Sequence, residues 1–329
     1  MYHAHFRGTH YEAGFRWGSL LLKHKNIILE NIPFEITQER IDYALSCLPI
    51  YEKYYHEIVE EIQGLADGQQ CDVRILQAVL FSMYSMPPSC NCSCFAFTTE
   101  QEILLGRNSD FLTEIERLNQ NVVYSFTGNT TAFIEIEDGV NEHGLAVGLT
   151  SVYPNQCKPG FNAGMIVRYL LEKCRNVSEA VSCLYQLPIA SAQTLTLADT
   201  MGAIAVIECN AEQIKIEKTL NSNIAFVCAT NTFHLPGMVG YNNDKIDNWF
   251  AEERYQTLYS AFSEKNGGFN FPFAEKLLSG DYGFLCQYDR STGKDTVWSV
   301  IYDMKRHKIY RSEGNPRRHK FKEDIRFQF

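Results

Sequence analysis

The chain has 329 residues, a formal net charge of −9, 45% apolar residues and 21% charged residues. This length can bury a sizeable core in one large domain or two smaller ones, and the composition is typical of a globular protein. The acidic balance disfavours nucleic acid and anionic membranes as partners, because both bind basic patches. The sequence contains no apolar run long enough to span a membrane.

The eleven cysteines are an odd number, which argues against a fully paired disulfide framework. The N-terminus has no basic region followed by an apolar region, so no secretory signal is expected. Together these features predict reduced thiols in a cytoplasmic protein. No phosphate-binding loop, paired metal-binding histidines or G-x-S-x-G elbow occurs, so no cofactor is expected.

The N-terminal part of the chain is predicted to be mainly helical. Residues 9–30 open with a capping box, in which the side chains of Thr9 and Glu12 satisfy each other's backbone N–H groups. Apolar residues recur at helical spacing in two further stretches, which are closed by glycines and by prolines respectively: 41–68 and 72–86.

Further along the chain the pattern changes to short β-rich runs with two helical stretches between them. A hairpin is expected to join 121–128 to 131–139 across the sequence GNTT. The helical stretches are 163–187 and 247–264. The other predicted strands are 92–100, 102–108, 144–153, 192–199, 202–210, 213–220, 223–231, 295–304 and 307–314.

This order of elements favours an α+β fold. Most strands follow one another as hairpins and the helices come in groups, which suits antiparallel sheets covered by helices better than a parallel βαβ arrangement. The sequence has no internal repeat, low-complexity segment or clear linker. Residues 1–329 are therefore predicted to form a single layered domain.

Three cysteines at alternate positions, Cys90, Cys92 and Cys94, precede the first predicted strand pair. Alternation on a strand directs all three sulfur atoms to one face. Structural zinc sites favour C-x2-4-C pairs with a second ligand pair elsewhere, and no such second pair is present. Buried cysteine is common, so the residues alone favour a core strand slightly over a nucleophile and leave both open.

The sequence GRNSD places Arg107 and Asp110 soon after these cysteines, next to an expected turn at the end of strand 102–108. A neighbouring strand could carry both side chains beside a cysteine thiol. Arginine favours the thiolate form of cysteine, and aspartate can orient an amine. A surface ion pair would give the same pattern, so this observation does not decide the chemistry.

Residues 92–110 resemble the segment that opens the mature catalytic chain of N-terminal-nucleophile amide hydrolases. The nearest group is the acyl-coenzyme A:6-aminopenicillanic acid acyltransferase family, with choloylglycine hydrolases and penicillin V acylases as relatives. Residues 6–18 are similar to its signature G-x-x-Y-E-x-G-x-x-x-G, 139–150 to its N-E-x-G-L-A hairpin, and 229–233 to a T-N-H-F strand end. The resemblance implies an αββα sandwich of antiparallel sheets covered by helices.

The spacing within this resemblance selects one cysteine. In the family, the nucleophilic cysteine is followed by Ser or Thr and precedes a box that ends in aspartate. Cys92 is followed by Ser93 and lies 18 positions before Asp110. Neither Cys90 nor Cys94 has a following residue that fits. Cys92 is therefore the position at which the resemblance implies the nucleophile.

Chains of the acyltransferase family that this segment resembles cut themselves before the nucleophilic cysteine, so the resemblance implies self-cleavage between Asn91 and Cys92. The Cys92 thiolate would attack the Asn91 carbonyl carbon in an N→S acyl shift, and water would hydrolyse the resulting thioester. Residues 1–91 would remain bound as a helical leader or small subunit, and residues 92–329 would form the catalytic chain.

The resemblance also implies roles for five other residues. The freed α-amine, with an ordinary pKa near 8, would act as general base for its own thiol. Asp110 would hold this amine and Arg107 would favour the thiolate. Asn231 would donate its side-chain amide, and Thr150 its main-chain N–H, to the oxyanion. Arg254 matches an arginine on a later catalytic-site helix.

The implied activity is cleavage of a linear amide C–N bond through an acyl-thioester, with transfer of the acyl group to water or to an amine. The expected partner is a small-molecule amide such as an N-acyl amino acid or β-lactam-like amide; an acyl-CoA, an amine acceptor and a homo-oligomer stay open. The alternative substrates are bile salts or penicillin V. The alternative from another class is a non-catalytic or metal-binding protein that uses the strand with Cys90, Cys92 and Cys94.

Overall fold

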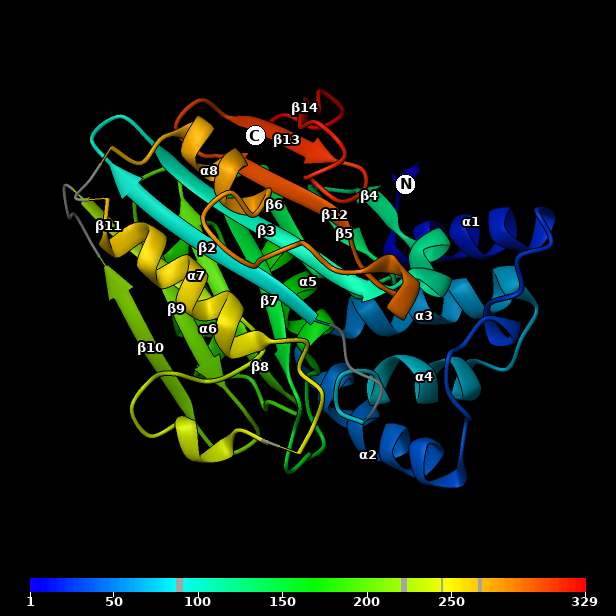
Figure 1. Ribbon diagram of the computed structural model, residues 1–329. Coiled ribbons are helices and arrows are strands. Elements are labelled where there is room, and N and C mark those ends of the chain that lie inside the picture. The colour runs from blue at the N-terminus through cyan, green and yellow to red at the C-terminus, as the bar shows by residue number, and fades with distance from the viewer. Residues whose placement is uncertain (87–90, 220–223, 244, 266–267) are drawn as a thin grey trace.

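The computed structural model describes residues 1–86, 91–219, 224–243, 245–265 and 268–329. Within these ranges the chain forms two β-sheets that pack face to face and carry helices on their outer faces (Figure 1). The predicted α+β class, with antiparallel sheets covered by helices, is confirmed.

The larger sheet has eight strands within the described ranges, in the order β1-β4-β5-β6-β7-β8-β9-β10. The β1–β4 pair is parallel, and every other neighbouring pair is antiparallel. The strands are β1 (Tyr2–His5), β4 (Gln120–Val123), β5 (Phe126–Thr130), β6 (Asp138–Asn141), β7 (Leu145–Val152), β8 (Ala192–Asp199), β9 (Ile204–Cys209) and β10 (Ile214–Thr219).

The smaller sheet has six described strands in the order β11-β2-β3-β12-β13-β14, all paired antiparallel. These strands are β2 (Asn91–Thr99), β3 (Ile103–Leu112), β11 (Ile224–Ala229), β12 (Lys294–Asp303), β13 (Lys308–Ser312) and β14 (Lys322–Glu323).

The described part of the chain contains eight α-helices and four short 3-10 turns. The helices are α1 (His10–Lys23), α2 (Gln38–Tyr54), α3 (His56–Gln69), α4 (Val73–Ser82), α5 (Ala163–Lys173), α6 (Val177–Leu184), α7 (Ala251–Ser263) and α8 (Phe271–Leu278). The 3-10 turns are η1 (Ile28–Glu30), η2 (Thr113–Leu118), η3 (Val239–Tyr241) and η4 (Arg290–Thr292).

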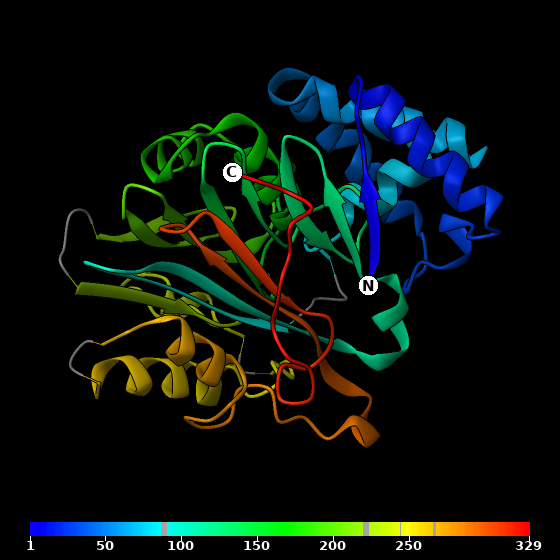
Figure 2. The ribbon, with the colours of Figure 1, turned by 90° about the horizontal axis from the view of Figure 1, so that it is seen from above.

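Four layers result from this packing. Helices α5 and α6 cover the outer face of the larger sheet, and α7 and α8 cover the outer face of the smaller sheet, as Figure 2 shows. The two sheets meet in the middle, so β2 and β3 are buried on both faces. Phe95 and Phe97 pack under α7 and α8, whereas Cys94 and Ala96 face the larger sheet. The odd-even alternation of β2 thus directs its cysteines into the space between the sheets.

Helices α1 to α4 lie together beside the sandwich (Figures 1 and 2). The predicted capping box of Thr9 and Glu12 is present at the start of α1. The predicted single helix 41–68 is wrong, because the chain breaks at Tyr55 into α2 and α3. The predicted helix 72–86 is shorter, since α4 ends at Ser82, and the prolines expected to close it lie outside the described residues.

The glycines expected to end the second helix instead lie inside α3, where they allow close contact with α1. A Cβ atom on Gly14 would lie 2.1 Å from the carbonyl oxygen of Glu61, and one on Gly64 would lie 2.1 Å from that of Tyr11. Two backbones can approach this closely only where neither residue has a side chain in the way. Gly14 and Gly18 of the N-terminal signature are therefore packing residues.

Two expectations about turns are also wrong. The Gly-Arg-Asn sequence is not a turn, because β3 continues through it to Leu112. Gly106 is required there, since a Cβ atom would lie 2.4 Å from Cζ of Phe95. The predicted hairpin across GNTT is replaced by one between β4 and β5, and residues 131–137 form a short turn with an isolated bridge. Phe133 has a positive φ of 59° in that turn, which breaks the strand.

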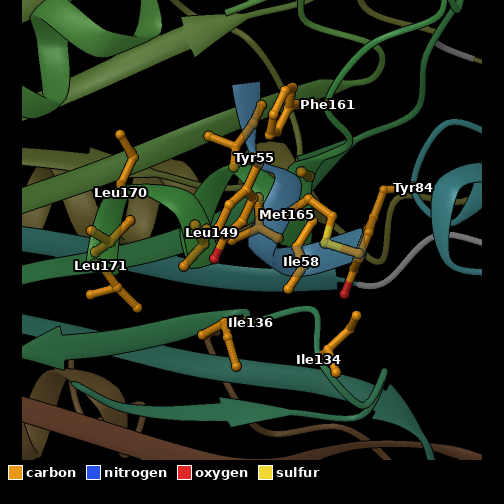
Figure 3. Packing of buried hydrophobic residues seen from close by; sticks show 14 of the residues in the cluster. Tyr55, Ile58, Tyr84, Ile134, Ile136, Leu149, Phe161, Met165, Leu170 and Leu171 are labelled. Atoms are coloured by element: carbon orange, nitrogen blue, oxygen red, sulfur yellow. The ribbon is translucent and has the colours of Figure 1, made fainter. Parts of the chain in front are cut away.

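The largest apolar cluster joins the N-terminal helices to the sandwich. Tyr55, Ile58 and Tyr84 from the N-terminal region are buried against residues that include Met165 of α5 and Leu149 of β7, as Figure 3 shows. Burial of apolar surface stabilises the folded state by about 25 cal/mol per Å². Because they share this buried cluster with the sandwich, the N-terminal helices are part of the main core.

We expect Gly14→Ala to destabilise the protein, because its Cβ must displace the backbone of α3. Overpacking of this kind lowers the free energy of unfolding by about 1–3 kcal/mol. The higher helix propensity of alanine raises it by at most about 1 kcal/mol, so we expect a net loss of stability. Thermal unfolding measures the difference. Gly240→Ala is the control, since a Cβ atom there would meet no other atom within 4 Å and its φ is ordinary. Equal melting temperatures for the two variants would contradict the packing role.

Candidate active site

Cys92 lies at the start of β2 and is completely buried between the two sheets. Its neighbour in β3 is Ser109. Cys94 points in the same direction and packs against Gly148 of β7, where a Cβ atom would lie 2.5 Å from its sulfur. Burial raises the pKa of the Cys94 thiol to about 12, which suits a core residue. Cys90 lies outside the described residues.

Arg107 lies on β3 and is completely buried beside Cys92. Its Nη2 donates to Sγ of Cys92 at 2.7 Å. Its Nε donates to the carbonyl oxygen of Leu149 at 2.8 Å, and its Nη1 donates to Oδ2 of Asp138 at 2.8 Å. A guanidinium in contact with a sulfur atom favours the thiolate form. The sequence-based expectation that Arg107 lies beside the thiol agrees with this geometry.

Arg254, in the first turn of α7, is completely buried and reaches Cys92 from the other side. Its Nη1 donates to the carbonyl oxygen of Cys92 at 2.5 Å and to Oγ of Ser93 at 2.9 Å. Its Nη2 donates to Oδ1 of Asn231 at 2.9 Å, and its Nε donates to the carbonyl oxygen of Trp249 at 3.0 Å. Arg254 is thus a buried anchor of the site, and not an exposed helical arginine.

Asn231 follows β11 and contacts the backbone nitrogen of Cys92. Its Oδ1 accepts from the N–H of Cys92 at 2.8 Å, and its Nδ2 donates to the carbonyl oxygen of Ser151 at 2.6 Å. Two donors at Oδ1 and one acceptor at Nδ2 fix the orientation of the amide. Asn231 would therefore also hold the nitrogen that becomes an α-amine if the chain is cut before Cys92.

Asp110 lies on β3 opposite Asn91 and is completely buried. Thr296 Oγ1 donates to its Oδ1 at 2.6 Å, and Tyr288 OH donates to its Oδ2 at 3.0 Å. Burial raises the pKa of Asp110 to about 6, although Arg254, at 3.7 Å from Oδ2, and these hydroxyls oppose the rise. A carboxyl group in this state can accept a charged amine at neutral pH.

Thr150 lies in β7 and pairs with Thr194 of β8. Its Oγ1 donates to the carbonyl oxygen of Thr194 at 3.5 Å. The residues on either side of it contact the site, since the carbonyl of Leu149 accepts from Arg107 and that of Ser151 accepts from Asn231. Its role as an oxyanion donor stays a prediction.

Two cavities meet at Asn91, the residue before Cys92. The larger has a volume of about 400 Å³ and is mainly apolar, and both Asn91 and Asp110 line it. The smaller has a volume of about 30 Å³ and a mixed wall, in which Asn231 and other amide and hydroxyl side chains stand beside apolar groups. Asp247 belongs to both walls. Asn91 therefore borders a mainly apolar space and a smaller one of mixed polarity.

Three aromatic residues in the wall of the larger cavity have left-handed backbones. The φ angles are 60° for Tyr84, 59° for Phe133 and 53° for Trp249. Such a conformation costs on the order of 1–3 kcal/mol for a residue other than glycine and concentrates at functional sites. Trp249 also accepts the hydrogen bond from Arg254, which connects the cavity wall to the residues around Cys92.

Several residues of the site were not anticipated from the sequence. Asp138, Tyr288, Thr296 and the carbonyl group of Leu149 come from strands or loops far from Cys92 in sequence. Asp138 stands directly before the N-E-x-G-L-A-like hairpin, which was a usable signal. Tyr288 and Thr296 lie in stretches with no motif, so nothing in the sequence could have identified them.

Metal binding and membrane insertion find no support in the described residues. No group of three or more His, Cys, Asp or Glu side chains there is arranged to hold a metal ion. Cys90, one of the three cysteines of the metal-binding alternative, lies outside those residues. Among the helices of the described ranges, none combines the length and apolar character needed to cross a membrane.

Asp110 gives a pH-dependent prediction. Its folded pKa of about 6 lies above the value of about 3.9 expected in the unfolded chain, so the folded state binds a proton more tightly between these values. Stability should therefore fall by on the order of 2–3 kcal/mol as the pH rises from about 4 to about 6.5. The measurement is urea unfolding of Cys92→Ala, compared with Cys92→Ala/Asp110→Asn. The double variant should lack this decline; parallel curves would rule out Asp110 as its source.

Comparisons with known proteins bear on the family to which the chain belongs. The sequence model of the family described as acyl-coenzyme A:6-aminopenicillanic acid acyl-transferase matches residues 97–318. The comparison with curated protein sequences gave no match.

Several solved structures are similar in fold at low identity. An ortholog of N-acylethanolamine-hydrolyzing acid amidase from Caenorhabditis elegans is 16% identical, with a TM-score of 0.47 over 65% of this chain and 93% of that one. Penicillin V acylase from Agrobacterium tumefaciens is 15% identical, with a TM-score of 0.43 over 68% and 83%. A mutant conjugated bile acid hydrolase from Clostridium perfringens is 14% identical, with a TM-score of 0.44 over 72% and 97%. Similarity at this level carries no argument about function.

The family match covers more than half of the chain and begins shortly after Cys92, within β2. It includes the motifs at 139–150 and 229–233 and most of the one at 92–110, and it agrees with the sandwich of two mainly antiparallel sheets. The chain therefore belongs to the acyl-coenzyme A:6-aminopenicillanic acid acyl-transferase family, and it is an enzyme of the cysteine N-terminal-nucleophile amidohydrolase and acyltransferase class.

Proposed function

We propose that Cys92 is the nucleophile of a linear amide C–N hydrolase or acyltransferase. One observation carries this proposal: three side chains converge on the sulfur, the nitrogen and the carbonyl oxygen of one residue. Arg107 donates to the sulfur of Cys92, Asn231 accepts from its nitrogen, and Arg254 donates to its carbonyl oxygen. A buried cysteine that only packs, such as Cys94, has no need of such contacts.

The first reaction of this site would be cleavage of its own chain. The Cys92 sulfur attacks the Asn91 carbonyl carbon, the C–N bond breaks, and the nitrogen of Cys92 takes up a proton. Water then hydrolyses the thioester, which leaves a carboxylate on Asn91 and restores the thiol. Arg107 at the sulfur and Asn231 at the nitrogen support this step, because they contact the two atoms that exchange the acyl group.

The same residues would then act on an external amide. The free α-amine of Cys92 takes the thiol proton as the sulfur attacks the substrate carbonyl carbon. Asp110 and Asn231 hold that amine, and the proton passes on to the leaving amine. Oxyanion stabilisation by the Asn231 amide and the Thr150 main-chain N–H stays a prediction; one such donor typically contributes about 10²–10³ in rate.

The larger cavity supports a substrate whose acyl group is apolar. In self-cleavage the acyl part is Asn91 and the leader residues before it, so the external acyl group should occupy the same side of Cys92. The cavity that Asn91 shares with Val79, Met83 and Phe133 is mainly apolar, and its volume of about 400 Å³ lies within the usual range for small-molecule sites. The smaller cavity beside Asn91, with amide and hydroxyl groups in its wall, suits the amine or water.

Contacts across the proposed cut support a leader that stays bound as a second chain. Glu61 of α3 is buried and accepts from Arg168 at 2.8 Å and from Tyr124 at 2.7 Å, both in the proposed catalytic chain. Glu172 accepts from Tyr55 of the leader at 2.6 Å. Removal of one partner from a buried ion pair typically costs about 3–5 kcal/mol, so the two fragments should remain associated.

Four further features stay proposals: the acyl acceptor, an acyl-CoA as acyl donor, a cytoplasmic location and a homo-oligomer. The smaller cavity, of about 30 Å³, has room for about one water molecule, which favours hydrolysis over transfer to a large amine. Bile salts and penicillin V remain alternative substrates.

We expect purified protein to contain two chains, 1–91 and 92–329, of which the second begins with the sequence CSCFAF. Intact mass measurement and N-terminal sequencing detect them. Cys92→Ala should remain a single chain of 329 residues, because it lacks the attacking sulfur. Cys94→Ala is the matched control, since this second buried cysteine on the same strand face should be dispensable for cleavage. If only intact chain is found and Cys92→Ala equals the wild type in an amidase assay, the proposed function fails.

We expect the volume of the apolar cavity to set the preferred acyl group. Ala132→Leu should shift the preference to shorter straight-chain N-acyl amino acids, and Met83→Ala to longer ones, because both residues line the cavity. Each methylene that fits contributes about 0.8 kcal/mol, or roughly fourfold in kcat/KM. The measurement is the ratio of kcat/KM along an acyl series within each variant, with penicillin V and a glycine-conjugated bile salt included. Unchanged ratios in both variants would remove the cavity from acyl recognition.

A further inference from the structure

One buried carboxylate outside the predicted site contacts residues of both sheets. Asp138, at the start of β6 in the larger sheet, is completely inaccessible to solvent. Its Oδ2 accepts from Nη1 of Arg107 at 2.8 Å and from Nε1 of Trp298 at 2.9 Å. Its Oδ1 accepts from Nδ2 of Asn129 at 2.6 Å and from the hydroxyl of Tyr302 at 2.7 Å. Four donors thus fix both oxygens of one side chain.

The donors come from different layers of the fold. Arg107 lies on β3, and Trp298 and Tyr302 lie on β12, all in the smaller sheet, whereas Asn129 lies on β5 beside β6. Asp138 therefore holds the guanidinium of Arg107 across the gap between the sheets. A buried network is rigid and holds one geometry when each of its polar groups has a hydrogen-bond partner.

A second carboxylate competes for the same guanidinium. Oε2 of Glu137 lies 3.5 Å from Nη2 of Arg107, which is the nitrogen that donates to Sγ of Cys92 at 2.7 Å. Glu137 is buried, and this burial raises its pKa, with Arg107 opposing the rise. Oγ of Ser109 also accepts from Nη1, so Asp138 is the charged one of two acceptors at this nitrogen. Without that charge, the guanidinium could rotate toward Glu137 and leave the sulfur.

We propose that Asp138 is the positioning residue that keeps Arg107 on the sulfur of Cys92 and away from Glu137. This inference rests on the proposed function, in which Cys92 is the nucleophile. Asp138 lies outside the wall of the substrate cavity. Among its four donors, Arg107 is the one that contacts the Cys92 sulfur, so we expect Asp138 to act on the thiol through Arg107. Its removal should affect the ionisation of the thiol more than the binding of substrate.

The groups that can influence this thiol come from every element around it. Glu137 and Asp138 face Arg107 from the larger sheet, and Cys94 lies beside it on β2. Asp110 and Arg254 face Cys92 from β3 and α7, and Tyr288 faces it from the segment before η4. Tyr302 and Arg311 reach Asp138 from β12 and β13. The test must therefore vary Asp138 and leave these groups in place.

The experiment measures the rate of alkylation of Cys92 by iodoacetamide between about pH 5 and pH 9, by mass spectrometry of the peptide that contains it. Asp138→Asn should move the midpoint up by about one pH unit or more, because the thiolate loses the adjacent guanidinium. It should also lower kcat by about tenfold or more with little change in KM. Asp199→Asn is the matched control: Asp199 is also buried and accepts from backbone N–H groups around it, and its loss should leave the midpoint unchanged.

Tyr302→Phe is the second variant, to be used if Asp138→Asn does not fold. It keeps the aromatic ring and removes one hydrogen-bond donor to Asp138. The midpoint of Cys92 alkylation should rise in this variant too, by a smaller amount. In the double variant Glu137→Gln/Asp138→Asn, the carboxylate that competes for Arg107 becomes a neutral amide. The midpoint of Cys92 alkylation should therefore return toward the wild-type value. If Asp138 acted only through its charge, Asp138→Asn would move the midpoint down; a fall or no change overturns the proposal. A wild-type Cys92 with the midpoint of an ordinary thiol, near about 8.5, would instead refute the proposed function.

Discussion

The contact between the guanidinium of Arg107 and the sulfur of Cys92 is the interaction on which the rest of the site depends. It lies in the solvent-inaccessible space between two sheets, where an isolated charge would be unstable. The arginine can remain there because the carbonyl of Leu149 and the carboxylate of Asp138, both from the opposite sheet, satisfy its other nitrogens. The sandwich thus supplies the charge balance that a reactive thiol needs.

The same constraint explains why the chain has its unusual order. A nucleophile that must lie at the start of a central strand and also carry a free amine can be made only by cutting the chain there or by beginning it there. Here helices α1 to α4 precede the strand, contribute Val79 and Met83 to the apolar cavity, and are joined to the sandwich by the buried pair of Glu61 and Arg168. In this account the leader is both a precursor segment and part of the substrate site.

Much of this arrangement could be predicted from the sequence, and the rest could not for identifiable reasons. Apolar periodicity and turn residues indicated the helices and most strands, and the family resemblance, through its spacing to Asp110, selected Cys92. The sequence did not reveal that Gly64 packs against α1 or that β3 continues past Gly106 to Leu112, because glycine marks turns and close contacts alike. Asp138 was missed because its partners in β12 lie far along the chain.

The central claim is that one sulfur, on a newly formed N-terminus, carries the acyl group. The most direct measurement is peptide mapping by mass spectrometry after brief reaction with an apolar-acyl p-nitrophenyl ester and acid quenching. The account predicts one acyl group, labile to hydroxylamine, on a peptide that begins at Cys92. An acyl group confined to the exposed Cys157, with Cys92 unlabelled inside an uncut chain, would contradict it.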